Sequence, residues 1–287
     1  MAESKPSWWG RLLGRSNPAE ADDAAPEGDA GGAAAAQELP VSGAVVGLCF
    51  DYERDLAFDS AELSDIGLEH ILTVLRRHKL RATFNCAAKL CEEVAHQIRT
   101  IADAGHEIAC LGYAGESWAD AEPGLIKELV FKCRNAFAKA GYSPIGFRSK
   151  STLCTPVVAR ELQLQRFRYN SQHDHGKHPY VLISGDRALA RVPVATDDRG
   201  YVKARKSGQI SENELISKHH RYLRKAITRK HFVSIGFHPW ILAEEDSRMR
   251  EWELWLETAI QGGARIGALE DALPASYRKL TPVEDEE

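Results

Sequence analysis

Three acidic residues follow an apolar run near the start of the chain. The run Ala44–Leu48 continues into the sequence CFDYERD at residues 49–55. An apolar run that ends in carboxylates is typical of a buried parallel strand, which delivers acids to the carboxyl edge of a sheet where α/β folds place their chemistry. Because side chains alternate along a strand, Asp51, Glu53 and Asp55 would point the same way. Such a cluster favours a bound cation or a raised pKa on one carboxyl, and a solvated loop is the alternative.

Histidines supply the second set of groups with possible chemistry. His238 follows the apolar run 231–237 and precedes Pro239, which cannot continue a strand, so the histidine would lie at a carboxyl edge. The stretch His173–His178 holds three histidines and one aspartate, a composition that can bind zinc or nickel. No two histidines in that stretch have the i,i+4 spacing of a helical metal site, so solvated polar residues are the simpler interpretation.

Strand and helix patterns alternate around these residues. Apolar residues recur with helical spacing at 60–79, 88–104, 123–140, 211–229 and 247–261. Strand patterns occur at 81–86, 107–111, 146–148 and 231–237, with a β-rich excursion at 180–194. Pro123 is suited to begin the third helix, and Gly141 to end it. This alternation predicts an α/β fold, a mostly parallel sheet with flanking helices.

The order of the motifs resembles that of the polysaccharide deacetylases, the NodB-homology group of carbohydrate esterase family 4, over about residues 43–275. The family's Phe-Asp-Asp-Gly motif corresponds to Phe50–Glu53, and its Lys-Ala-Thr-Phe-Phe strand to Arg81–Asn85. Its Gly-His-Glu-Ile-Gly-Asn-His-Thr-x-x-His motif corresponds to Gly105–Gly115. Its Arg-x-Pro and final His motifs correspond to Arg148–Lys150 and His238–Trp240. The resemblance implies a distorted (β/α) barrel of the deacetylase type.

The resemblance also implies roles for the residues that are retained. Asp51 corresponds to the catalytic base of the family, Arg148 to the residue that orients this carboxylate, and His238 to the general acid. Tyr52 and Trp240 adjoin these motifs and are expected to contact the substrate. The site would therefore keep the family's acid–base groups.

The family's metal ligands, by contrast, are missing from this sequence. Members hold a divalent ion with an aspartate and two histidines, and these positions correspond to Tyr52, Leu111 and Gly115. Leucine and glycine side chains offer no donor to an ion, so we expect the usual metal to be absent. Zinc, nickel or cobalt would require a rebuilt site, for which the weak candidates are Glu53, Asp55, His173 and His175.

Length, charge and cysteine content exclude some classes of protein. The 287 residues are 44% hydrophobic and suffice for one barrel domain. The net charge of −4 gives no electrostatic reason to expect binding to nucleic acid. The six cysteines form no C-x-x-C pair and are expected to be small buried residues in a reducing compartment. No secretory signal or membrane-spanning run is evident, so a cytoplasmic location is expected.

Composition also divides the chain into three parts. Residues 1–42 are expected to form a flexible N-terminal arm and linker, because residues 16–42 contain almost no large apolar residue. The arm carries Trp8 and Trp9 beside basic residues and could dock a partner or a membrane surface, a disordered leader being the alternative. Residues 43–275 would form the barrel, and residues 276–287 an acidic tail.

Two classes of function remain open. The first is a hydrolase of carbon–nitrogen amide bonds in acetylated sugars or another small acylated amine, with a degenerate metal site and low activity. The second is a non-catalytic barrel of the same type that binds a glycan or a partner. Metal analysis and acetate release from acetylated sugars would distinguish them.

Overall fold

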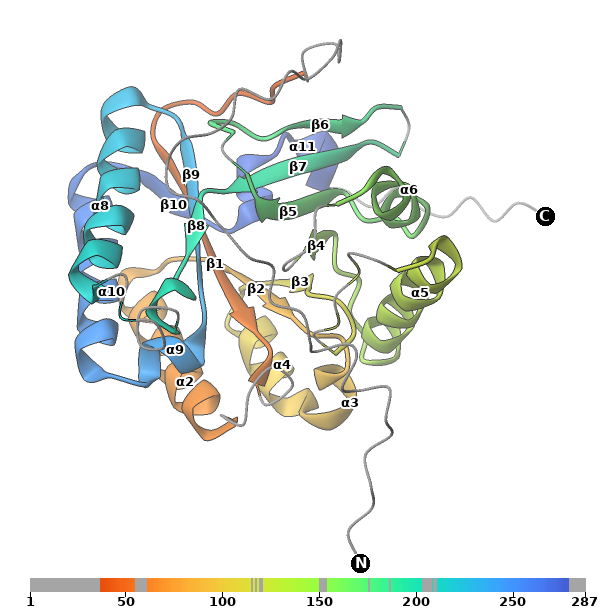
Figure 1. Ribbon diagram of the computed structural model, residues 1–287, viewed down its shortest axis with the longest axis horizontal. Coiled ribbons are helices and arrows are strands. Elements are labelled where there is room, and N and C mark those ends of the chain that lie inside the picture. The colour runs from red at the N-terminus through yellow and green to blue at the C-terminus, as the bar shows by residue number, and fades with distance from the viewer. Residues whose placement is uncertain are drawn as a thin grey trace, which may run out of the picture. The chain divides into compact units, whose positions relative to one another are not determined.

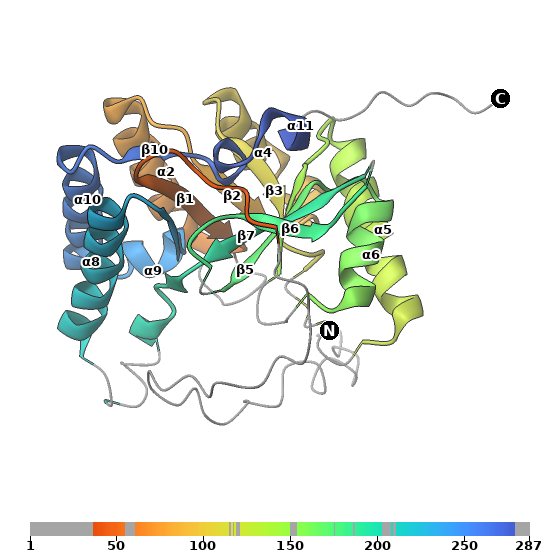
Figure 2. The same cartoon turned by 90° about the horizontal axis from the view of Figure 1, so that it is seen from above.

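The computed structural model describes residues 37–54, 61–114, 116, 118, 121–149, 154–174, 176–185, 187–202, 208 and 211–278. These residues form one ten-stranded sheet with helices around its outside (Figures 1 and 2). The strands are β1 (Val45–Tyr52), β2 (Thr83–Cys86), β3 (Glu107–Cys110), β4 (Gly146–Arg148), β5 (Tyr169–His173), β6 (Tyr180–Ile183), β7 (Leu189–Val194), β8 (Thr196–Asp197), β9 (Phe232–Phe237) and β10 (Arg265–Gly267). Their order is β6-β7-β5-β4-β3-β2-β1-β9-β8, and β10 pairs with β1.

The sheet is mostly parallel and curls back toward its own start. Among the described pairs, all but β6 with β7 are parallel. The segment Leu189–Asp197 is interrupted only at Ala195; its first part, β7, pairs with β5, and its second part, β8, pairs with β9. One nearly continuous segment thereby bridges the two sides of the sheet. This arrangement confirms the predicted distorted barrel with flanking helices.

Strand β1 lies at the centre, as its apolar sequence predicts. All eight of its residues are buried, because it has β9 on one side and β10 and β2 on the other. In this register Asp51 lies opposite Asn85 of β2, and Phe50 lies opposite Phe237 of β9. The carboxyl ends of β1, β2 and β9 therefore meet at one edge of the sheet.

The helices on the outside are α2 (Ala61–His78), α3 (Leu90–Glu93), α4 (Ala95–Asp103), α5 (Pro123–Lys139), α6 (Pro156–Leu164), α8 (Glu212–Arg229), α9 (Pro239–Ala243), α10 (Asp246–Gln261) and α11 (Ala275–Arg278), with a 3₁₀ turn at Leu269–Ala272. Pro123 begins α5, and Gly141 follows its end with φ +84°, as predicted. At the start of α8, Ser211 and Glu214 form a reciprocal capping box, which satisfies two otherwise unpaired backbone N–H groups.

Helix α2 packs unusually close to α9, and this contact depends on a glycine. A Cβ atom added at Gly67 would lie 2.1 Å from the carbonyl oxygen of Pro239. No side chain fits in that space, so only glycine lets the two backbones approach this closely. Because Pro239 directly follows His238, the helix contact also fixes the position of the histidine.

Two predicted boundaries differ from the structure. The helix expected at 88–104 is divided into α3 and α4, because Val94 leaves helical geometry with φ −140° and ψ 49°. Residues 37–41, expected to belong to the linker, lie against β6: the amide of Val181 donates to the carbonyl of Gln37 (2.8 Å), and the amide of Leu39 donates to that of Pro179 (2.6 Å). The Trp8–Trp9 arm and residues 279–287 lie outside the described residues.

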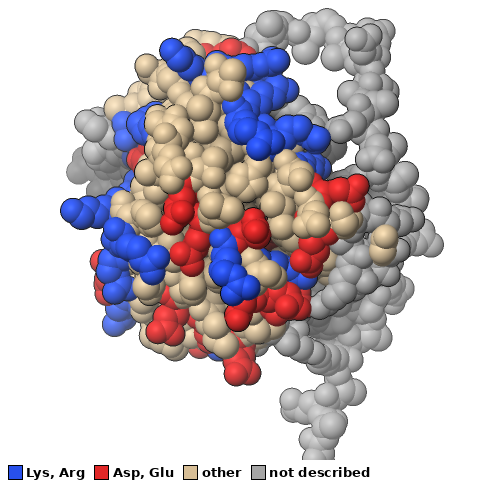
Figure 3. Space-filling view, turned by 90° about the vertical axis from the view of Figure 1, so that its left-hand side faces the viewer, with Lys and Arg blue, Asp and Glu red and all other residues tan. Residues whose placement is uncertain are grey.

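The remaining features of the fold concern its thiols and its surface. All six cysteines carry free thiols, and five of them are buried. Basic and acidic side chains are interspersed on the face that carries α8 and α10 (Figure 3). No described helix is both long enough and apolar enough to cross a membrane.

Candidate active site

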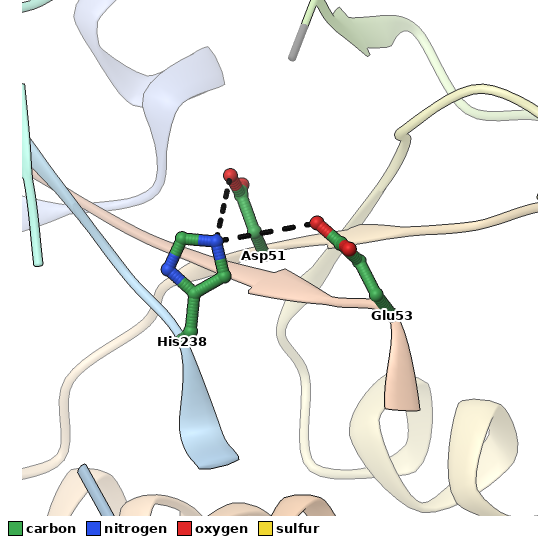
Figure 4. Close-up of side chains that lie close together, drawn as sticks. All are labelled: Asp51, Glu53 and His238. Atoms are coloured by element: carbon green, nitrogen blue, oxygen red, sulfur yellow. Dashed lines mark ion pairs between the residues drawn. The ribbon is translucent and has the colours of Figure 1, made fainter. Parts of the chain in front are cut away.

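Asp51, Glu53 and His238 converge at the carboxyl edge of the sheet. Asp51 lies at the end of β1 and Glu53 just beyond it, while His238 follows β9 and is the N-cap residue of α9. The Nε2 atom of His238 lies 3.8 Å from Asp51 Oδ2 and 4.0 Å from Glu53 Oε1 (Figure 4). All three side chains are at most 2% exposed. The structure thus brings together residues that are almost 190 positions apart in the sequence.

The carboxylate of Asp51 is held by residues from two other strands, β2 and β4. Asn85 of β2 donates from Nδ2 to Oδ1 at 2.7 Å, and Arg148 at the end of β4 donates from Nε to Oδ2 at 3.3 Å. Burial alone would raise the pKa of Asp51, but the charge of Arg148, followed by that of His238, outweighs it and holds the pKa below its usual value. Asp51 is therefore an ionised, oriented carboxylate at neutral pH.

Arg148 contacts Asp51 through one nitrogen, Nε. Its guanidinium is fully buried, and neither Nη1 nor Nη2 has a hydrogen-bond partner among the described residues. A Cβ atom at Gly236 of β9 would lie 3.5 Å from Nη2. The guanidinium therefore lies between β4 and β9, and only its Nε reaches the carboxylate.

Asp198 holds His238, and sequence reasoning did not identify this partner. The backbone amide of His238 donates to Asp198 Oδ2 at 2.8 Å, and Nδ1 lies 2.6 Å from Oδ1. Since an ionised carboxylate only accepts, the ring proton belongs on Nδ1 and Nε2 faces Asp51 and Glu53. Burial alone would lower the pKa of His238, but the charge and hydrogen bond of Asp198 raise it above 6.5.

The sequence did contain a signal for both missed residues. Asn85 lies near the end of the predicted strand 81–86, the next strand after β1 in the chain, so a parallel pairing would place it beside Asp51. Asp198 belongs to the tract Thr196–Tyr201, which follows the predicted β-rich excursion. The position of Asp198 after a strand indicates that it lies at the carboxyl edge of the sheet, but not that it contacts His238.

A second polar cluster involves His173, one of the weak metal candidates. Its Nε2 lies 2.9 Å from Asp197 Oδ2, and Arg199 donates to the same oxygen from Nε at 2.5 Å. Burial would raise the pKa of Asp197, but the hydrogen bond from His173 and the charge of Arg199 hold it well below its usual value. His173 is thus paired with Asp197 and does not join the group around Asp51. His175 and Asp55 lie outside the described residues.

The residues at the family's metal positions do not fit an ion. The Tyr52 hydroxyl donates to Asp65 Oδ1 at 3.0 Å, and burial, followed by Asp65, raises its pKa so that it stays neutral. Leu111 is buried and has no donor atom, and Gly115 lies outside the described residues. Of these positions, those that the structure describes offer no charged ligand.

The structure corrects the expected role of one of the two substrate contacts. Successive side chains of a strand face opposite sides, so Tyr52 points away from Asp51 toward α2 and is fully buried. Tyr52 therefore cannot line a substrate site. Trp240 packs with Tyr201 behind the histidine, and its ring centroid lies 6.4 Å from that of His238. Substrate contact by Trp240 stays a prediction.

Comparisons with known proteins place this geometry in context. The family model for polysaccharide deacetylases matches residues 39–153. A solved structure from Mycobacterium smegmatis, described as a polysaccharide deacetylase, has a TM-score of 0.71 and 22% identity, covering 87% of this chain and 96% of that one. The Puue allantoinase has a TM-score of 0.67 and 14% identity, covering 78% of this chain and 86% of that one. No curated protein sequence matches.

A third solved structure is similar in fold and is described as lacking the family's activity. This CE4 family pseudoenzyme from Bacillus anthracis has a TM-score of 0.54 and 15% identity, covering 81% of this chain and 66% of that one. A mutant of it is described as having restored enzymatic activity. At these identities the likeness concerns the fold, and it confirms the predicted barrel type.

Proposed function

We propose that the chain is a divergent polysaccharide deacetylase-like protein that hydrolyses a carbon–nitrogen amide bond by acid–base catalysis. The match of residues 39–153 to the family model and the shared fold support this proposal. Asp51 is the general base, and His238, held by Asp198, is the general acid. The observation that carries the proposal is the position of His238, whose Nε2 faces Asp51 while its Nδ1 is bound to Asp198.

Neighbouring residues keep the general base, Asp51, ionised and oriented. An ionised Asp51 accepts a proton from a water molecule as that water attacks the amide carbon. Arg148 and Asn85 each hold one oxygen of the carboxylate, so its direction is set before the substrate binds. These contacts favour the ionised form and keep the base available down to acidic pH.

The general acid, His238, must by contrast carry a proton. The departing nitrogen must receive a proton, and protonated His238 can supply it from Nε2. Asp198 stabilises the imidazolium and fixes the ring, in the manner of the aspartate of a catalytic triad. Two neighbouring groups whose pKa values are displaced in opposite directions are the pattern expected of an acid and a base in one site.

The absence of the family's ligands sets an expectation for the rate. A bound metal ion can lower the pKa of its water from about 15.7 to about 7. A carboxylate alone does not make up this difference, so we expect hydrolysis to be slow compared with metal-assisted relatives. An acetylated sugar or another small acylated amine remains the expected substrate class, and a cytoplasmic location stays a prediction.

Acetate release tests the proposal. The full chain, treated with EDTA, is incubated with chitooligosaccharides and with small acetylated sugars. Release is expected for the unmodified chain and is expected to fall at least about 100-fold in Asp51→Asn and in His238→Gln. Exposed Glu257→Gln and His96→Gln are matched controls that should keep the rate.

Two results would contradict the proposal. The first is that acetate release in EDTA is the same in the unmodified chain and in Asp51→Asn. The second is that neither substrate releases acetate under any condition. The second result would favour the non-catalytic barrel, for which the likeness to a described pseudoenzyme is the supporting observation.

A further inference from the structure

We propose that Asp51, Glu53 and His238 together bind one divalent transition-metal ion, and that this ion switches the site off. The binding site is new in position, because it uses neither Tyr52 nor Leu111 of the family's metal positions. The switching rests on the proposed function, since it concerns the same acid and base. The two parts of the inference are separable by experiment.

The distances between the three side chains suit a shared ion. One ligand atom from each residue lies within 4.8 Å of the other two. The Nε2 of His238 is 3.8 Å from the Asp51 oxygen and 4.0 Å from the Glu53 oxygen. Zinc bonds to nitrogen and carboxylate oxygen are about 2.0–2.2 Å long, so two ligand atoms on one tetrahedral ion are about 3.4 Å apart, somewhat closer than these atoms are here. Small rotations of the side chains therefore suffice.

The histidine supplies the observation that points to a ligand. Nε2 of His238 is buried and has no hydrogen-bond partner among the described residues, and it points between Asp51 and Glu53 (Figure 4). Buried polar atoms nearly always have a partner, so one without any marks a place for a missing group. With the ring proton on Nδ1, Nε2 presents a lone pair toward the two carboxylates.

Asp198 completes an arrangement that is common around protein-bound metals. Ligating histidines usually donate their other ring N–H to a carboxylate, which fixes the ring and strengthens the ligand. Here the Nδ1–Oδ1 distance is 2.6 Å, and a second bond holds the backbone of His238 to the same carboxylate. Asp51 has its own support from Asn85. Both ligands are therefore oriented without the ion.

Charge and ligand type indicate which ion would bind. Among the described residues, the carboxylates of Asp51, Glu53, Asp197 and Asp198 outnumber the guanidiniums of Arg148 and Arg199 that lie near them, so a divalent cation would balance excess negative charge. One imidazole nitrogen and two carboxylate oxygens suit zinc, cobalt or nickel better than calcium or magnesium, which prefer oxygen ligands alone.

An ion at this place would stop the proposed hydrolysis. It would occupy the Nε2 lone pair of His238, which could then not carry the proton for the departing amine. It would also occupy the Asp51 oxygen that faces the histidine. The effect on activity is therefore the opposite of that of the metal in the family's enzymes.

Binding is tested with zinc alone on the full, EDTA-stripped and dialysed chain. Equilibrium dialysis with metal analysis should find one zinc per chain. Glu53→Gln and His238→Gln should weaken this binding at least about 100-fold, and Asp198→Asn about 10–100-fold, as for other carboxylates that support a ligating histidine. His173→Asn is the matched control, because His173 pairs with Asp197 elsewhere, and should keep the affinity within about twofold.

Three results would overturn the binding site. These are the absence of bound zinc, zinc binding that survives Glu53→Gln, and binding that is lost in His173→Asn. Thermal unfolding distinguishes a variant that has lost the site from one that has not folded. Zinc should raise the melting temperature of the unmodified chain and of His173→Asn but not of folded Glu53→Gln. A Glu53→Asp variant, which keeps a carboxylate, should retain measurable binding.

The switching is tested by acetate release. One equivalent of zinc should reduce the rate at least about tenfold, and EDTA should restore it. A rate that rises with zinc would overturn the switching. A chain that binds zinc through Glu53 but hydrolyses nothing would overturn the proposed function, and the switching with it, while confirming the ion site.

Discussion

Asp198 holds His238 at two points, one on the backbone and one on the ring. Oδ2 accepts from the backbone amide at 2.8 Å, and Oδ1 lies 2.6 Å from Nδ1. The amide of Asp198 in turn donates to the carbonyl of Gly236 on β9 at 3.1 Å. One residue thus fixes the chain where β9 ends and also the direction in which Nε2 points.

Asp198→Asn should move the alkaline side of the pH–rate profile to lower pH. Catalysis requires protonated His238, and this form is lost as the pH rises through the pKa that Asp198 raises. Without that charge the pKa falls, and we expect kcat/KM at neutral pH to fall about 100–10,000-fold. The measurement is kcat/KM between pH 5 and 9. Exposed Asp103→Asn serves as the control, and an unchanged alkaline limb in Asp198→Asn would contradict the assigned role.

Arg148→Gln should move the acidic side of the profile to higher pH. Arg148 is the strongest of the charges that lower the pKa of Asp51. Its removal should leave the base protonated, and the enzyme inactive, at a higher pH than in the unmodified chain. The loss of one partner of a buried ion pair should also cost about 3–5 kcal/mol of stability. Activity below pH 6 and urea unfolding measure the two effects; an acidic limb that does not move would count against Asp51 as the base.

Glu107→Gln should reduce the dependence of stability on pH. The carboxyl of Glu107 accepts hydrogen bonds from the hydroxyls of Tyr169 (2.7 Å) and Thr83 (2.5 Å). Burial, followed by the charge of Glu270, raises its pKa from 4.5 to about 7. The folded state therefore binds this proton more tightly than the unfolded state does. This contribution, on the order of 3 kcal/mol, is complete below the unfolded pKa and is lost as the pH rises through about 7.

Urea unfolding at pH 5 and pH 8.5 tests this expectation. The unmodified chain should lose stability between the two values, and Glu107→Gln should lose much less. Exposed Glu257→Gln should behave like the unmodified chain. An equal loss in Glu107→Gln would show that other groups set the pH dependence.

Gly67→Ala should destabilise the fold and slow catalysis together. The added Cβ would meet the Pro239 carbonyl oxygen at 2.1 Å, so α9 must move, and His238 with it. Overpacking of this kind costs about 1–3 kcal/mol. Gly124→Ala, where nothing lies within 4 Å of the added atom, should instead be neutral or stabilise by about 0.5–1 kcal/mol. Urea unfolding and acetate release of the two variants compare them; equal effects would exclude the close contact as the cause.

Much of the fold follows from local patterns in the sequence. The apolar run before Asp51 and the proline after His238 each specify where a strand ends, because alternation, burial and the missing proline N–H act over a few residues. The boundaries of α5 follow in the same way from Pro123 and Gly141. Helix α6 was missed although Thr155-Pro156 is an N-terminal signal, with the Thr155 hydroxyl accepting from the Val158 amide at 3.3 Å.

The sequence by itself determined that Asp51, Arg148 and His238 each end a strand at one edge of a parallel sheet, since strand type and direction depend on neighbours along the chain. Only the tertiary structure decided that Asp198 meets His238, that Tyr52 turns toward Asp65, and that Nε2 of the histidine faces two carboxylates. These contacts depend on strand register, on the curl of the sheet through Leu189–Asp197, and on burial, which join residues far apart in the chain. The displaced pKa values have the same origin, because charges and desolvation act through space.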